Sequence, residues 1–236
     1  MGCIDKIKAE LQACGRPEKV EHLTRFFQAF KGGYGEGDKF LAVDIPSQRK
    51  IARKYYKEIS LREIESLLKA DIHEYRTAAL MMLEYKLKKA DEAGSERIVG
   101  LYLRNIKHIN NWDLIDSSAP NILGGYLYDK DRQLIYDFAA SGDLWKQRIA
   151  IMTTYFFIKQ KDFKDALKIC RMYLNHKHDL IHKASGWMLR EIGNRDFDAE
   201  YGFLRSYYKK MPRTMLRYAI EKFPEDLRQR FLKGEE

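Results

Sequence analysis

The sequence of 236 residues predicts an all-α protein, and three observations support this prediction. Apolar residues recur at intervals of three and four, as in Leu80, Leu83 and Leu87, which is the spacing of one helix face. Alternating patterns typical of strands are nearly absent, and the best candidate is the short segment KFLAV at residues 39–43. A helix-borne motif also recurs at a regular interval. We therefore expect about a dozen helices of roughly 10–17 residues, joined by short loops.

The regular interval comes from a motif of a basic residue, any residue and a small residue. It begins at Arg76, Arg148, Lys183 and Arg217, which are 72, 35 and 34 positions apart, and the midpoint of the first step is residue 112. A period of 34–36 residues is typical of helical repeats. Since the tetratricopeptide consensus residues are missing, the pattern predicts a HEAT-like α-solenoid of antiparallel helix pairs with a concave basic groove.

We expect residues 1–236 to form one HEAT-like repeat domain. We expect N-terminal helices within residues 1–45 to form a cap and the repeats to occupy about residues 46–232, with boundaries at the five prolines and at several glycines. The glycine-rich stretch KGGYGEGDKF, residues 31–40, lacks the Lys-Ser/Thr end of a phosphate-binding loop and does not lie between a strand and a helix. We predict a mobile surface loop there.

Composition limits the classes of function. The net charge of +9 and the pI of about 9.3 favour an anionic partner such as nucleic acid. There is no apolar run of the ~18 residues that span a membrane and no signal-peptide core. The three cysteines are far apart, and His176 and His178 lack clustered partners for a metal. We expect a cytoplasmic protein that works with the DNA and needs no metal or cofactor.

The segment NNWDLIDSSAP, residues 110–120, is unusual because it holds two carboxylates and no Lys or Arg within a basic chain. Trp112 occupies the repeat position where other repeats place a basic residue, and Asp116 lies one helical turn later. Asn111 as a helix cap and Trp112 as a core residue remain an open alternative. Equivalent positions of a solenoid line one surface, so we expect one groove to contain Trp112, Asp116, Arg148, Lys183 and Trp187.

Such a groove suits the phosphate backbone of a DNA duplex. Basic side chains bind phosphates without reading base sequence. The candidates for these contacts are Arg49, Lys50, Arg53, Arg76, Arg148, Lys183, Arg190 and Arg217. For each of them, a solvated helix face is the alternative.

Tryptophans beside a carboxylate suggest a cationic target, because aromatic faces attract cations. Alkylation at N3 or N7 of a purine makes the base cationic and weakens its glycosidic bond. One aspartate can stabilise the oxocarbenium-like sugar and position water, and the activated base needs no separate acid. No lysine is indicated as a Schiff-base nucleophile, which argues against a strand-cleaving lyase.

The sequence resembles the AlkD-like DNA alkylation repair glycosylases, which are HEAT-like solenoids that release N3- and N7-alkylated purines. The resemblance covers nearly the whole chain through YGEGDKFLAVDIPSQR, NNWDLIDSSAP, DLWKQRIAIM and HKASGWMLREIG. It implies that the family's W-D-x-x-D pair is Trp112 and Asp116, that its groove arginine is Arg148 and that its second tryptophan is Trp187. It further implies a monofunctional glycosylase acting on double-stranded DNA with alkylated bases, without an obligate protein partner.

Three features complete this comparison of motifs. Asp44 departs from the pattern, which has a basic or neutral residue there. The family's aromatic from the second helix is commonly Tyr, and here it is Phe26 or Phe27. Asp113 is expected to be structural, favoured by the dipole at a helix start.

The alternative to an enzyme is a non-catalytic α-solenoid of the same fold that binds DNA or a protein.

Overall fold

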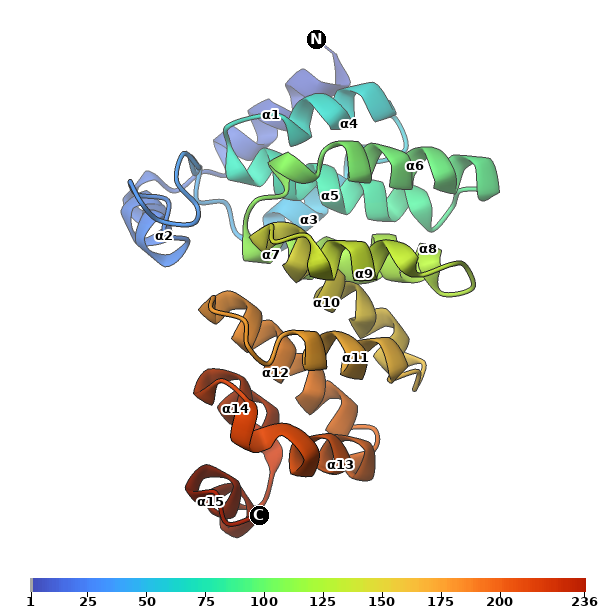
Figure 1. The fold of residues 1–236 in the computed structure, drawn as a ribbon. Coiled ribbons are helices and arrows are strands. Elements are labelled where there is room, and N and C mark those ends of the chain that lie inside the picture. Colours follow the sequence, from blue (N-terminus) through green and yellow to red (C-terminus); the bar gives the residue numbers. More distant parts are fainter. Residues whose placement is uncertain (1) are drawn as a thin grey trace. The chain divides into compact units, whose positions relative to one another are not determined.

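The computed structural model describes residues 2–236, and within this range every regular element is a helix (Figure 1). The all-α prediction is confirmed. The described residues contain no strand, and their one isolated β-bridge joins Lys39 to Ile72. The best strand candidate, KFLAV, is not a strand. Its backbone bonds to a side chain instead, because the N–H groups of Leu41 and Ala42 donate to the Glu74 carboxylate at 3.0 and 2.7 Å.

The chain divides into two compact units, residues 1–118 and 119–236. Unit 1 contains two short 3₁₀ helices, η1 (Pro17–Lys19) and η2 (Ile106–His108). Its α-helices are α1 (Cys3–Ala13), α2 (Val20–Phe26), α3 (Ile45–Tyr55), α4 (Leu61–Leu68), α5 (His73–Leu87), α6 (Glu92–Arg104) and nearly all of α7 (Trp112–Ala119). Helix α5 packs against α3 and α4, and also contacts α1 and α6.

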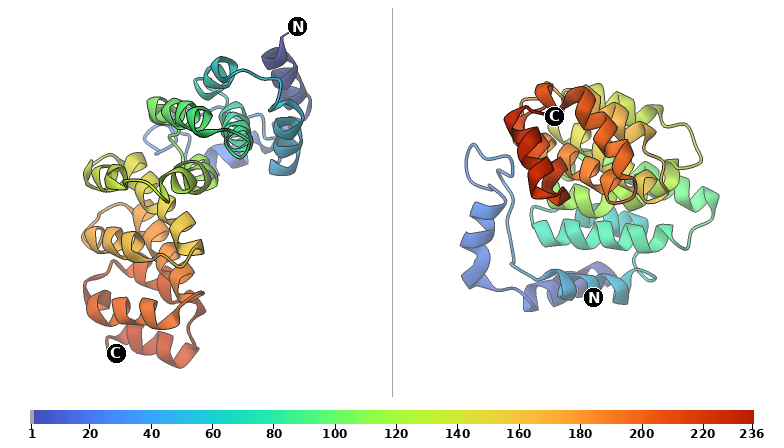
Figure 2. Two further views of the ribbon diagram at one scale, coloured as in Figure 1. Left: turned by 90° about the vertical axis from the view of Figure 1, so that its right-hand side faces the viewer. Right: turned by 90° about the horizontal axis from the view of Figure 1, so that it is seen from below.

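The core of unit 1 explains why these segments are helical. Ile64, Leu67 and Leu68 of α4 are fully buried at intervals of three and four, so one face of this short helix packs into the core. Ser60 begins α4 with a capping box in which Glu63 bonds back to Ser60. By contrast, α2 has no fully buried residue and stands at one side of the unit (Figures 1 and 2).

Unit 2 begins with a π-helix, η3 (Pro120–Gly124), and continues with further helices. These are α8 (Gly125–Leu127), α9 (Gln133–Ala140), α10 (Leu144–Lys159), α11 (Lys164–Met172), α12 (Asp179–Gly193), α13 (Phe197–Tyr207), η4 (Tyr208–Lys210), α14 (Arg213–Ala219), η5 (Ile220–Lys222) and α15 (Glu225–Lys233). Helix α10 packs against α9, α11 and α12, and α12 packs against α13 and α14 (Figure 2). Helices α10, α12 and α14 therefore stack in sequence order within this unit.

The π-helix follows directly from the sequence. Pro120 has no N–H to continue the hydrogen bonding of α7, and the chain widens into a π turn rather than ending the helix. A Cβ on Gly124 would lie 2.5 Å from Phe156 Cβ and 2.6 Å from Thr153 O, so glycine allows this wide turn to lie directly on α10.

The five repeat positions predicted from the sequence fall on five alternate first helices, α5, α7, α10, α12 and α14. Their places along these helices differ. Arg148, Lys183 and Arg217 are each the fifth residue of their helix and Arg76 is the fourth, whereas Trp112 is the first residue of α7. Helix ends are defined only to within one or two residues, and the offset of Trp112 by three to four positions exceeds that margin. The continuous solenoid, the single domain and the common groove remain predictions.

None of the helices in residues 2–236 combines the length and apolar character that crossing a bilayer requires.

Candidate functional site

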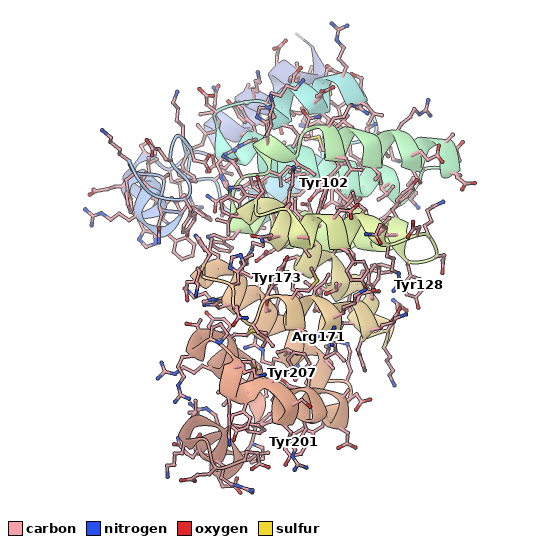
Figure 3. The ribbon with its side chains drawn as sticks, viewed as in Figure 1. Tyr102, Tyr128, Arg171, Tyr173, Tyr201 and Tyr207 are labelled. Atoms are coloured by element: carbon pink, nitrogen blue, oxygen red, sulfur yellow. The ribbon has the colours of Figure 1, made fainter. Side chains whose placement is uncertain are left out.

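Trp112 and Asp116 lie one turn apart on α7, and both are partly buried. The same helix buries Leu114, Ile115 and Ser118 almost completely, which fixes α7 against the interior. Ser118 also shares a hydrogen bond of 3.1 Å with the hydroxyl of Tyr102, a fully buried residue of α6 (Figure 3). Burial, with the nearby charge of Asp116, raises the pKa of Tyr102.

Aromatic rings surround Trp112 within unit 1. Phe27 stacks on Trp112 with ring centroids 5.3 Å apart, and Phe26 meets Trp112 edge-on at 5.6 Å. Phe27 continues into the interior, where it stacks on Phe40 at 5.4 Å and on His73 at 5.0 Å. Phe26 is 53% exposed. Both aromatic candidates from the second helix therefore contact Trp112, with Phe27 on the inner side and Phe26 on the solvent side.

Behind the aromatic rings lies a cluster of four charged side chains, which we call the His73 cluster: Asp38, His73, Arg76 and Asp113. His73 Nδ1 lies 2.9 Å from Asp38 Oδ2, and His73 Nε2 lies 2.8 Å from Asp113 Oδ2. Arg76 donates to the other oxygen of Asp38 at 2.5 Å. The side chains of Asp38, His73 and Arg76 are 4–5% exposed, so these charges interact largely away from solvent.

Electrostatics make His73 a cation. Burial alone would lower the pKa of His73, but the hydrogen bonds to Asp113 and Asp38 outweigh it and raise the pKa to about 9. Burial likewise opposes ionisation of Asp38, yet the bond from His73 and the charge of Arg76 hold the pKa of Asp38 below its usual value. The four groups thus form two cations and two anions, and the cluster is neutral overall.

The His73 cluster also holds the two residues before Trp112. Arg76 donates to the Asn110 side chain and, at 3.2 Å, to the backbone oxygen of His108. Asn111 is fully buried, and its amide donates to Asp38 at 3.3 Å while its oxygen accepts from the Trp112 N–H at 2.9 Å. The expected cap role of Asn111 therefore coexists with a partly buried Trp112 that contacts Phe26.

Arg76, a predicted DNA contact, lies inside unit 1. Its guanidinium is buried and its hydrogen bonds go to unit 1 itself. The glycine-rich stretch is a largely exposed loop, and Asp38 anchors its end to α5. Gly35 lies so close to Phe27 that a Cβ would be 2.4 Å from its backbone oxygen.

Asp113 lies in the first turn of α7, where the sequence places it, and its partner His73 was not predicted. A signal for the cluster was present in HEYR, since His73 and Arg76 are three residues apart on one helix. Their partner Asp38 is more than thirty residues away, and the sequence does not reveal that contact.

Helix α3 presents an exposed basic face. Arg49, Lys50 and Arg53 are exposed, while Gln48, Ile51, Ala52 and Tyr55 on the same helix are buried. The basic residues line a shallow hollow of about 470 Å³ together with Pro46 and Lys54. Asp44, the departure from the motif, is the N-cap of this helix, bonding Ser47 N at 2.8 Å and Arg16 at 3.0 Å.

The remaining predicted residues belong to unit 2. Arg148 is buried on α10 and donates to Leu180 O at 2.5 Å. The hydroxyl of Tyr173 donates to the backbone oxygen of Gln147, the residue before it, at 2.9 Å (Figure 3). Arg148 is therefore held by the fold of unit 2, not extended into solvent.

On α12, Trp187 is partly buried, contacts Tyr155 with centroids 5.8 Å apart and donates to Glu191 at 3.2 Å. Tyr155 is a neighbour that the sequence reasoning missed, although it lies two turns after Arg148 on α10. Among the predicted DNA-binding residues of this unit, Lys183 pairs with Asp179 at 2.7 Å, Arg190 pairs with Glu221, and Arg217 is exposed.

Within residues 2–236, no three His, Cys, Asp or Glu side chains gather closely enough to hold a metal ion.

The fold identifies the structural class of this protein, and the sequence identifies its family. Residues 2–236 form packed helices and no sheet, which defines an all-α protein. The chain belongs to the DNA alkylation repair enzyme family, whose sequence model matches residues 7–223.

Two solved structures share the fold. One is a predicted DNA alkylation repair enzyme from Enterococcus faecalis, with a TM-score of 0.72, 14% identity, and coverage of 89% of this chain and 97% of that chain. The other is AlkD2 from Streptococcus mutans, with a TM-score of 0.56, 18% identity, and coverage of 87% of this chain and 97% of that chain. None of the curated proteins matches the sequence.

Proposed function

We propose that this member of the DNA alkylation repair enzyme family is a monofunctional DNA glycosylase of base-excision repair. Its substrate would be double-stranded DNA carrying purines made cationic by alkylation at N3 or N7. The observation that carries the proposal is the pair of Trp112 and Asp116, which α7 holds one turn apart beside Phe26 and Phe27.

The proposed reaction needs one carboxylate. As the bond between C1′ and N9 breaks, its electron pair goes to the alkylated base, which leaves as a neutral molecule. Positive charge develops on the deoxyribose, and Asp116 stabilises it at short range. Water then attacks C1′, and its proton passes to Asp116 or to solvent. Because the positive charge already activates the base, no second acidic residue is required.

The rings around Trp112 have separate tasks in this proposal. The faces of Trp112 and the exposed Phe26 attract the cationic nucleotide, by about 0.5–2 kcal/mol for each good contact. Phe27 lies inside and keeps Trp112 in place through stacking. Neither phenylalanine has a hydroxyl, so neither can supply a phenolic hydrogen bond.

Residues of unit 2 complete the proposal. We assign Arg148 and Trp187 to the reaction because they match the family motifs, with Trp187 packing on the sugar. Lys183, Arg190 and Arg217, with the basic face of α3, would bind phosphates. Binding that rests on phosphate contacts weakens steeply as salt rises, because the contacts release counterions.

The test replaces Asp116 by Asn, which keeps the shape and removes the charge. We expect release of 7-methylguanine from methylated duplex DNA to fall by about 10²-fold or more, on the scale of ~3 kcal/mol, while duplex affinity is retained. Asp137→Asn, the same change at an exposed residue of α9, is the matched control and should leave the rate unchanged.

A wild-type rate for Asp116→Asn would refute the catalytic assignment. If the wild-type protein binds duplex DNA but releases no alkylated base, a non-catalytic DNA-binding protein of this fold replaces the proposal.

A further inference from the structure

We propose that His73 is a positioning residue for the reaction, and that its doubly hydrogen-bonded imidazolium ring fixes the start of α7 and thereby the placement of Trp112 and Asp116. The inference rests on the proposed function for its kinetic consequences. Its structural content can be tested without any substrate.

The first step is the protonation of the ring. His73 is the first residue of α5, and each of its ring nitrogens lies within 2.9 Å of a carboxylate oxygen. A carboxylate only accepts hydrogen bonds, so both nitrogens must donate. A neutral imidazole has a single N–H, and only the cation satisfies both aspartates at once.

The second step is the link to α7. Asp113 follows Trp112 directly, and its Oδ1 is buried without a hydrogen-bond partner in the protein. The bond from His73 to Oδ2 is therefore the contact that ties this carboxylate to α5. Loss of the His73 proton would leave a lone pair facing Asp113 or Asp38, and one buried carboxylate would lose its donor.

The third step is the ring stacking. Phe27 lies between His73 and Trp112, with centroids 5.0 and 5.3 Å from them. His73 thus supports α7 twice, through the carboxylate of Asp113 and through the Phe27 ring on the face of Trp112. A shift of the His73 ring moves both supports together.

The charged groups that face His73 come from three segments. They are Asp38 on the loop before α3, Arg76 on α5 and Asp113 on α7. Arg76 lowers the pKa of the ring, and the two aspartates oppose this effect. His73 therefore stays charged at neutral pH and loses its proton near pH 9.

The experiment measures single-turnover excision of 7-methylguanine between pH 7 and pH 10 with saturating protein, for the wild type and His73→Gln. We expect the wild-type rate constant to fall above about pH 9. His73→Gln should be slower by about tenfold or more at pH 7, with similar duplex affinity and without this alkaline fall, since small misplacements of reacting groups cost large factors in rate.

Two further variants separate positioning from general instability. Ile64→Val removes a methylene from the core of unit 1, away from the His73 cluster, and should keep both the rate and the alkaline fall. The double variant His73→Gln/Asp113→Asn should be no slower than the slower of the two single variants, because the two side chains act through one contact.

A second measurement does not depend on activity. Amide hydrogen exchange at pH 7 should be about tenfold faster in the peptide covering residues 110–120 in His73→Gln than in the wild type, and unchanged in Ile64→Val. If the wild type releases no alkylpurine, the proposed function fails and this exchange alone decides the positioning role. Unchanged exchange, a wild-type rate in His73→Gln or an equal loss in Ile64→Val would each overturn the inference.

Discussion

Asp38 of unit 1 and Glu200 of unit 2 are both buried acids, but they are stabilised in opposite ways. In unit 1, Asp38 is ionised and meets two cations, His73 and Arg76. In unit 2, Glu200 of α13 is 2% exposed, its Oε1 has no hydrogen-bond partner, and burial raises its pKa to about 9. Partners thus keep Asp38 charged, whereas Glu200 is neutral because it retains its proton.

This difference shows where backbone segments must be held at fixed distances from one another. A network of charge-assisted hydrogen bonds holds several backbone segments at defined distances, and in unit 1 these segments carry Trp112 and Asp116. Glu200 instead fills a narrow space, since a Cβ on Gly193 would lie 1.7 Å from its Oε2. A neutral acid there fills space beside α12.

The largest expected effect is a loss of stability when the buried ion pairs of unit 1 are broken. Arg76→Met removes one of the two cations that pair with Asp38 and leaves the Asn110 side chain without its donor. We expect the free energy of unfolding, measured in urea at pH 7, to fall by about 3 kcal/mol, as for other buried ion pairs that lose one partner. Weaker duplex binding with unchanged stability would instead restore Arg76 as a phosphate contact.

The second prediction concerns Glu200. The native protein holds this proton up to about pH 9, whereas the unfolded chain releases it near the ordinary value of 4.5. The unfolded state therefore binds fewer protons between these limits, and the free energy of unfolding falls as pH rises through that window. Glu200→Gln cannot ionise, so its stability relative to the wild type should rise by about 2 kcal/mol between about pH 6 and pH 7.5.

Urea unfolding of the wild type and Glu200→Gln at several pH values measures this difference. Asp137→Asn, at an exposed acid of the same unit, is the control and should show no such trend. A difference that does not depend on pH would mean that Glu200 is ionised in the native protein.

Particular residues show how much of the fold and of the candidate site can be predicted from the sequence alone. The all-α fold follows from apolar spacing, and Pro17, Pro46, Pro120, Pro212 and Pro224 all stand at or just before the first turn of a helix. The W-D-x-x-D motif also places Asp113 and Asp116 correctly on α7. Local sequence contains these signals because they act within one or two turns.

The His73 cluster could not be predicted in this way. His73 contacts Asp38 and Asp113, which are 35 and 40 positions away, and which acid meets which cation depends on how the loop before α3 folds back. The same cause explains why KFLAV, the best strand candidate, is not a strand: its N–H groups bond to Glu74, more than thirty residues later. The choice between Phe26 and Phe27 likewise required the ring geometry.

The third prediction uses the pH dependence of stability to distinguish His73 of unit 1 from Glu200 of unit 2. The pKa of His73 is raised from about 6.5 to about 9, so its contribution to stability is complete below pH 6.5 and is lost as pH rises through 9. Between pH 6.5 and 9.5 we expect Glu200→Gln to lose roughly 1–3 kcal/mol of stability, because it still contains His73. The double variant His73→Gln/Glu200→Gln should lose much less, and an equal loss in both would assign the alkaline transition to another group.

The smallest effect concerns a charge pair at the surface of unit 2. Arg190 pairs with Glu221, which is 52% exposed, so this pair contrasts with the buried pairs of the His73 cluster. Arg190→Ala should change the free energy of unfolding by only about 0–1 kcal/mol. If Arg190 contacts a phosphate, the same variant should reduce by about 1 the slope of the logarithm of duplex affinity against the logarithm of salt concentration.

The partner residue provides a test in the opposite direction. Glu221→Gln removes the competing carboxylate from Arg190 and should increase duplex affinity at low salt. Glu225→Gln removes the same charge from α15, where Glu225 pairs with Arg228, and corrects for the general effect of net charge. A larger gain in Glu221→Gln than in Glu225→Gln supports Arg190 as a phosphate contact, because only the first change releases its guanidinium. Equal gains would leave Arg190 as a surface ion pair, and the phosphate contacts of unit 2 would then rest on Lys183 and Arg217.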